Sequence, residues 1–163
     1  MKPYMRHRTA VILLMAFVLA LTGCRNIKDI RVLSVNLDSI SMRGFKSVDL
    51  HFSAEIDNPA RQIRLTEIDG SIIHSGKIIG RLVMDPFVLT ARSSETYTLK
   101  ANGSLAHGAG FKDLMILASP DGLNGCTVDF SAKAAHGKGA AVPVKMKDRP
   151  LKELLDRIEN EKI

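Results

Sequence analysis

Apolar and polar residues alternate with a period of two along several stretches of this chain. The apolar positions of residues 47–57 are Val48, Leu50, Phe52, Ala54 and Ile56. The same alternation recurs over residues 96–105 and 126–134. Because successive side chains of a strand point to opposite faces, this pattern predicts strands with one face in the core and the other in water.

Shorter apolar runs predict further strands at residues 31–40, 63–73, 78–83, 86–91 and 142–146. Gly70 is expected to bend its strand, Ser75-Gly76 to form a hairpin turn, and Gly80 to mark a bulge. A strand about every 12 residues leaves no room for a helix after each one. The spacing therefore predicts an all-β fold, an antiparallel sandwich of the fibronectin-III or immunoglobulin type with seven or eight strands and one or two short helices.

Two short segments have helical periodicity instead. The first carries Phe111, Leu114, Met115 and Ala118 on one side and ends at residues 119–122. The second begins near Pro150 and carries a stripe of Leu151, Leu154, Leu155 and Ile158. Both stripes either cap the core or line a hydrophobic groove between sheet and helix, with Phe111, Leu114 and Met115 as the candidate groove residues.

The start of the chain has the pattern of an export signal. Its basic residues are Lys2, Arg6 and Arg8. The apolar run that follows, Ala10–Leu21, has 12 residues, fewer than the ~20 that cross a bilayer as a helix. Leu21, Thr22, Gly23 and Cys24 come next and resemble the bacterial lipobox, at which a lipid is joined to the cysteine. The alternative is an ordinary secretory peptide with an incidental cysteine.

The lipobox resemblance divides the chain into three parts. Residues 1–23 are the signal peptide, residues 24–29 the lipidated N-terminus with a short spacer, and residues 30–163 the β-sandwich domain. Two or more acyl chains hold a protein stably on a membrane. Arg25 follows Cys24, and by the enterobacterial sorting rule this residue implies a lipid-anchored protein of the outer membrane that faces the periplasm.

The charge and composition of the chain limit the classes of partner that it can bind. The chain carries a net charge of +6, and removal of residues 1–23, with three basic and no acidic residues, lowers it to +3. The remaining basic residues are interleaved with acidic ones, there is no tryptophan, and no basic cluster with stacking aromatics is visible. The composition therefore predicts no nucleic-acid partner.

Few residues of the mature part have catalytic or metal-binding chemistry. Its histidines are His51, His74, His107 and His136. They lack the close spacing of a zinc site, and Cys126 shares the phase of apolar Val128 and Phe130, which predicts a buried thiol. No nucleophile motif or phosphate-binding loop occurs. The sequence predicts no enzyme, no metal and no cofactor besides the covalent lipid on Cys24.

One stretch resembles a known family. An alternating strand closes on Asn58 and Pro59, spaced aliphatic residues and a hairpin glycine, Gly76, follow, and residues 91–95 lead into the next alternating strand. In these features residues 50–105 resemble the late embryogenesis abundant type 2 family, also called the water stress and hypersensitive response (WHy) domain. Ala60 departs from the plant pattern after Asn-Pro. The resemblance implies a fibronectin-III-like sandwich without known catalytic residues, and roles in stress protection or in holding lipid along a groove.

These inferences together predict a membrane-tethered, non-enzymatic envelope lipoprotein that binds or stabilises envelope components, with a stress role implied by the resemblance. The expected partners are the membrane, through the lipid, and an envelope protein or a lipid ligand. The alternative function is a carrier that holds a lipid or another hydrophobic ligand in the groove between sheet and helix.

Overall fold

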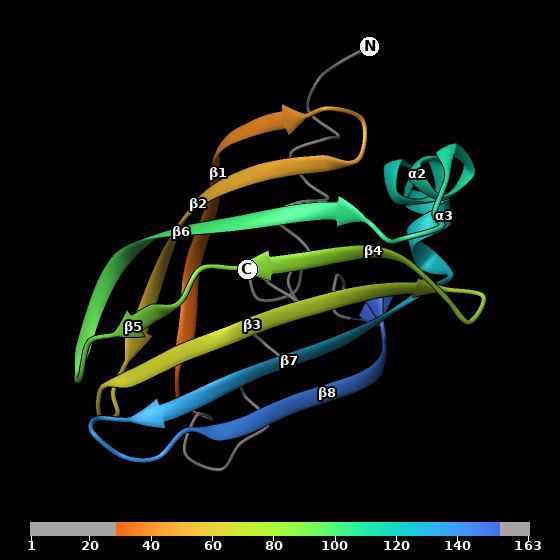
Figure 1. Cartoon of the computed structure of the whole chain (residues 1–163). Coiled ribbons are helices and arrows are strands. Elements are labelled where there is room, and N and C mark those ends of the chain that lie inside the picture. Colours follow the sequence, from red (N-terminus) through yellow and green to blue (C-terminus); the bar gives the residue numbers. More distant parts are fainter. Residues whose placement is uncertain (1–28, 154–163) are drawn as a thin grey trace.

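The structure is a computed structural model that describes residues 29–153, except for the side chain of Pro120 (Figure 1). Strands make up most of this part of the chain. The elements are β1 (Arg31–Arg43), β2 (Ser47–Asn58), β3 (Ile63–His74), β4 (Lys77–Met84), β5 (Phe87–Leu89), β6 (Ser93–Leu105), α2 (Phe111–Ala118), α3 (Pro120–Asn124), β7 (Cys126–His136) and β8 (Val142–Pro150).

All eight strands pair antiparallel in one continuous sheet. The order across the sheet is β1-β2-β6-β4-β3-β7-β8, and β5 pairs with the beginning of β3. Figure 1 shows α2 and α3 together at one end of the sheet, beyond the end of β6, with β5 at the other end. The predicted all-β, antiparallel, sandwich-like fold is confirmed.

The single sheet becomes sandwich-like because it divides after Met84. This residue still pairs with Ile68 of β3 and Ala101 of β6. Beyond it the chain leaves β6 and continues as β5, which pairs with β3 through Leu89 and Ile63. The early part of β6 keeps only β2 as its neighbour among the described strands. The sheet therefore opens into two layers, β1-β2-β6 and β5-β3-β7-β8.

The main core lies between these two layers. Its largest fully buried side chains are Phe52, Ile56, Ile63, Leu65, Ile68 and Leu89. The predicted alternation is confirmed, because the apolar positions of β2 from Leu50 to Ile56 and those of β7 from Cys126 to Ala134 are buried. A second core cluster continues the first under the helices and contains Ile72, Ile79, Leu123, Cys126, Val128 and Leu151.

The irregularity that was predicted at Gly70 occurs three residues earlier, at Glu67. Gly70 pairs regularly with Leu82 on one side and Phe130 on the other. The register against β7 shifts between Thr66 and Asp69 instead, where Glu67 adopts a φ of 49°. An extra residue of this kind reverses the alternation of side chains. It keeps both Leu65 and Ile68 in the core although they are three positions apart.

The predicted hairpin turn at Ser75-Gly76 is present. Both residues have positive φ, 51° and 75°, and they connect the paired residues His74 and Lys77. Two consecutive positive φ angles are typical of the tight type I′ turn, which suits the twist of two antiparallel strands. The predicted irregularity near Gly80 is also present, because the register between β3 and β4 shifts at Ile79.

The helix α2 forms where predicted but turns a different side to the core. Phe111 is 74% exposed and Met115 54% exposed, whereas Ile116 and Leu117 pack against the second cluster. The predicted buried face was therefore wrong. The physical reason is the next element, because α3 packs directly against α2. A Cβ on Gly122 would lie 2.5 Å from the carbonyl oxygen of Ile116, so this approach requires glycine.

The helix α2 ends before residues 119–122, as predicted, and a second short helix, which was not predicted, begins there. Ser119 begins α3, and its hydroxyl oxygen accepts a hydrogen bond of 3.0 Å from the Gly122 backbone N–H. At the end of the chain, Pro150 closes β8, residues 151–153 are helical, and Leu151 is buried in the second cluster. The other predicted stripe residues (Leu154, Leu155 and Ile158) lie outside the described residues.

We expect the two phenylalanines Phe52 and Phe111 to differ sharply in their effect on stability. Phe52→Ala removes a fully buried ring from the core and should lower the free energy of unfolding by about 3–5 kcal/mol. Phe111→Ala removes an exposed ring and should change it by no more than about 0.5 kcal/mol. Urea denaturation of both variants measures the difference, and a large loss in Phe111→Ala would contradict the orientation of α2.

Candidate functional site

The residues of the predicted lipobox, Leu21, Thr22, Gly23 and Cys24, lie outside the described residues. Attachment of a lipid at Cys24 therefore stays a prediction. The described chain enters the sheet at Arg31, the first residue of the edge strand β1. Within residues 29–153 no helix is long and apolar enough to cross a bilayer.

Asn58 of the family motif is the buried polar residue of the described core. Its side-chain nitrogen donates hydrogen bonds to the backbone carbonyls of Arg61 (3.1 Å) and Thr90 (2.9 Å). Its side-chain oxygen accepts one from the backbone N–H of Ala60 (3.1 Å). All the hydrogen-bonding partners of this buried side chain are therefore backbone groups of the adjacent loops.

The Asn58 side chain joins two loops that belong to different layers. Asn58 ends β2 of the first layer, and Thr90 follows β5 of the second. Backbone hydrogen bonds reinforce this junction, from Arg92 N–H to the Ala60 carbonyl and from Gly137 N–H to the Gln62 carbonyl, both 3.0 Å. The sequence identified Asn58 and Pro59 as a motif. It gave no signal for the partner in the second loop, because Thr90 lies 32 positions after Asn58 along the chain.

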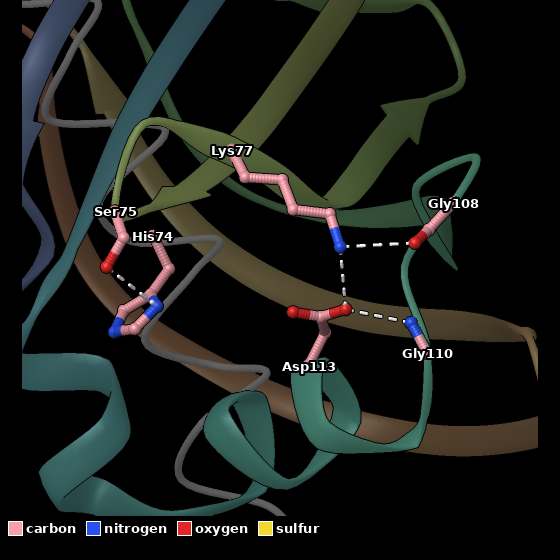
Figure 2. Close-up of polar contacts among 6 residues, drawn as sticks. All are labelled: His74, Ser75, Lys77, Gly108, Gly110 and Asp113. Atoms are coloured by element: carbon pink, nitrogen blue, oxygen red, sulfur yellow. Dashed lines mark hydrogen bonds and ion pairs between the residues drawn. The ribbon is translucent and has the colours of Figure 1, made fainter.

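A polar cluster at the other end of the sheet fixes the beginning of α2 (Figure 2). The Asp113 carboxylate accepts a hydrogen bond of 2.8 Å from the backbone N–H of Gly110. The Lys77 ammonium donates to the same carboxylate oxygen and to the Gly108 carbonyl, both at 3.1 Å. Lys77 follows the β3–β4 turn, so this strand hairpin holds the first turn of α2 in place.

These contacts set the charge state of Asp113. The Gly110 N–H, and after it the Lys77 ammonium, lower the pKa of the Asp113 carboxyl below its ordinary value. A second aspartate has a comparable environment. The side-chain amide of Asn102, 2.9 Å away, and the Arg43 guanidinium lower the pKa of Asp49. Both carboxylates therefore act as acceptors that hold neighbouring elements together.

Cys126 lies inside the domain, as its alternation predicts. It is a free cysteine and fully buried, and its thiol donates a hydrogen bond of 3.4 Å to the Gly122 carbonyl. Burial raises the pKa of this thiol, which opposes formation of the nucleophilic thiolate. The environment favours packing under α3 over reactivity.

The described residues contain no group of three or more potential metal ligands. Figure 2 also shows His74, whose ring nitrogen Nδ1 lies 3.4 Å from the Ser75 hydroxyl. These two residues lie at the β3–β4 turn and contact each other.

The structure does not bring Phe111, Leu114 and Met115 together in a groove between sheet and helix. Phe111 and Met115 face solvent, and Leu114 is half-buried. A small apolar cavity of about 20 Å³ lies instead at the boundary of the two core clusters. Its lining is Gly70, Ser71, Ile72, Leu82, Val128, Phe130 and Met146. A volume near that of one water-sized probe does not hold an acyl chain.

Neither a protein-family model nor a curated protein matches this chain. Two solved structures show a distant likeness. A protein from Archaeoglobus fulgidus is 12% identical with a TM-score of 0.41, over 71% of this chain and 93% of that one. The yeast GGA1 GAE domain is 13% identical with a TM-score of 0.29, over 72% of this chain and 95% of its own. Neither likeness informs the function, and the resemblance to the late embryogenesis abundant type 2 family stays a prediction.

Replacement of Asn58 should destabilise the domain in a way that depends on the new side chain. Asn58→Ala removes the side-chain partner of the Arg61 carbonyl and of the Ala60 N–H, and it removes one of the two donors to the Thr90 carbonyl, which we expect to cost about 1–3 kcal/mol. Asn58→Asp places a carboxyl among carbonyl oxygens, so burial and repulsion raise its folded pKa. Its stability should therefore be highest at low pH and fall as the pH rises through that value. Urea denaturation at several pH values measures both effects, and a pH-independent Asn58→Asp variant would contradict the buried contacts.

The Asp113 carboxylate should titrate below the ordinary value of about 3.9. Because its folded pKa is lowered, its contribution to stability is present above the unfolded pKa and is lost as the pH falls through the folded one. Lys77→Ala should raise the Asp113 pKa only in part, since the Gly110 N–H remains. Carboxyl titration by NMR measures the shift, with Lys112→Ala, which removes an exposed neighbouring lysine, as the matched control. An unchanged pKa in Lys77→Ala would contradict the contact.

Proposed function

We propose that this protein is a lipid-anchored, non-enzymatic protein of the bacterial envelope whose β-sandwich binds or stabilises other envelope components. The observation that carries the proposal is the sequence Leu21-Thr22-Gly23-Cys24 at the end of a basic and apolar leader. A multiply acylated cysteine is a stable anchor, and Arg25 after it favours the outer membrane with the domain in the periplasm.

The anchor supports a binding function by physical means. A domain confined to a membrane surface meets other membrane-associated molecules at a raised effective concentration, so weak contacts are sufficient for association. The described part of the chain offers such contacts on its surface, where several large apolar side chains are exposed, among them Phe45, Phe111 and Met115. Such side chains can contribute to an interaction site where they lie together in a patch.

The polar chemistry of the described residues supports a non-enzymatic role. The hydrogen-bonding groups of the Asn58 side chain are used to hold loops, and the two aspartates with lowered pKa values, Asp49 and Asp113, hold neighbouring elements. The alternative function, a carrier with a groove under α2, gains no support from the orientation of that helix. A stress role rests on the Asn58-Pro59 resemblance.

We expect Cys24→Ala to abolish lipid attachment and to release or mislocalise the protein. In cells fed with labelled palmitate, the wild-type protein should take up the label and sediment with outer membranes, and the Cys24→Ala variant should do neither. Cys126→Ala is the matched control, because it removes the other cysteine, which is buried, and should leave label and location unchanged. A labelled or firmly outer-membrane-bound Cys24→Ala protein would contradict the proposal.

A further inference from the structure

The two edge strands of the sheet differ in the side chains that they expose. The edge strand β8 carries the exposed cations Lys145, Lys147 and Arg149. Charged side chains of this kind keep a sheet edge solvated and block pairing with another strand. The opposite edge strand, β1, exposes Ile40 and Met42 near its last residue, whereas the exposed apolar side chain of β8, Val142, is its first residue.

Two apolar residues near the end of β1 lie on the core-facing side of the sheet but remain exposed. Ile40 and Met42 pair with Leu50 and Val48 of β2, so they lie on the same face of the sheet as the core. Leu50 is buried, but Met42 is 61% exposed. The core-facing side of β1 therefore extends past the core, and Ile40 and Met42 are exposed to solvent.

The turn after β1 continues this apolar surface. Phe45 lies at its tip and is 91% exposed, the largest exposure among the large hydrophobic residues described. Arg43 and Lys46 flank it, and both are exposed. Arg43 also forms an ion pair with Asp49, which holds the base of the turn. We call the surface of Ile40, Met42, Phe45, Arg43 and Lys46 the β1–β2 tip.

An apolar projection with flanking cations is complementary to a membrane surface with anionic headgroups. The apolar side chains enter the interface, and the cations remain at the level of the phosphates. The proposed anchor strengthens this choice of partner, because the chain from Cys24 enters the fold at Arg31, on the same edge strand. Those seven residues reach at most about 25 Å, so the anchor would hold the first end of β1 near the membrane, and the tip lies at the other end of this 13-residue strand.

We propose that the β1–β2 tip is a second membrane contact, through which the domain lies along β1 against a bilayer that contains anionic lipid. The inference rests on the proposed anchor for its orientation, but the contact itself depends only on the tip. A tethered domain needs only a weak second contact, because the lipid supplies a high local concentration. The membrane then covers Ile40, Met42 and Phe45, and β8 with its cations faces the aqueous side.

The chain has no tryptophan, so a single introduced tryptophan reports the contact directly. Phe45→Trp places it at the tip, and Val142→Trp places it on β8, at a residue that is 58% exposed. Each lipidated protein is reconstituted in vesicles of equimolar phosphatidylglycerol and phosphatidylcholine, with brominated acyl chains as the quencher. We expect emission from position 45 to be blue-shifted and quenched several-fold more strongly than emission from position 142.

Two further measurements make the outcome decisive. Lys46→Glu in the Phe45→Trp protein should weaken the quenching in these vesicles, whereas in pure phosphatidylcholine it should have little effect. Equal quenching at both positions would overturn the proposal. Stronger quenching at position 142 would also overturn it and would indicate that the domain contacts the membrane through β8. If the intact mass of the protein shows no lipid on Cys24, the proposed lipid anchor is disproved. Titration of the same vesicles into the protein without lipid then tests the membrane contact of the tip separately.

Discussion

The buried amide of Asn58 closes the end of the domain at which the sheet is open. The two layers are continuous only as far as Met84, where β4 still joins β3 and β6. Past that point they are held together by the core between them, by the contacts of the β2–β3 loop, and by hydrogen bonds from the Asp85 and Thr90 N–H groups to Lys100 and Tyr97 of β6. The hydrogen bond from Asn58 to the Thr90 carbonyl crosses from one layer to the other. Asn58 supplies the buried part of this connection between the layers.

At the opposite end of the domain the two layers are held together in a different way. There the layers need no polar junction, because β4 pairs with both of its neighbours and the helices α2 and α3 cover the second core cluster. What must be fixed is the helix pair itself, which follows a glycine-rich loop. The contact of Lys77 with Asp113 supplies that fixation from a neighbouring hairpin, and it lies near the surface, where it positions α2 more than it stabilises the whole fold.

The same architecture determines which surfaces are left for function. Alternating strands fill the space between the layers with apolar side chains, so little room remains inside for a ligand. The surface of the described domain is asymmetric, because β8 exposes several cations and β1 leads into a turn with an exposed phenylalanine. The proposed anchor would give this asymmetry a direction relative to a membrane.

Much of the fold followed from local patterns. Strict alternation in β2 and β7 identified their buried residues correctly, because a strand has only two faces and one of them must meet the core. The Ser75-Gly76 turn was equally local, since it depends on the φ angles of two adjacent residues. The irregularity in β3 was also expected, but at Gly70, whereas it lies at Glu67.

The side of α2 that faces the core could not be read from the same patterns. Apolar residues surround much of this short helix, so the spacing of Phe111, Leu114 and Met115 was as good a choice as Ile116 and Leu117, and the packing of α3 against Ile116 decided between them. The partners of Asn58 were also hidden, because hydrogen bonds between distant loops leave no periodic trace. The sequence by itself determined the strands, their inward residues and the signal for an anchor. Only the tertiary structure decided which apolar residues remain exposed, because exposure depends on which elements meet in space.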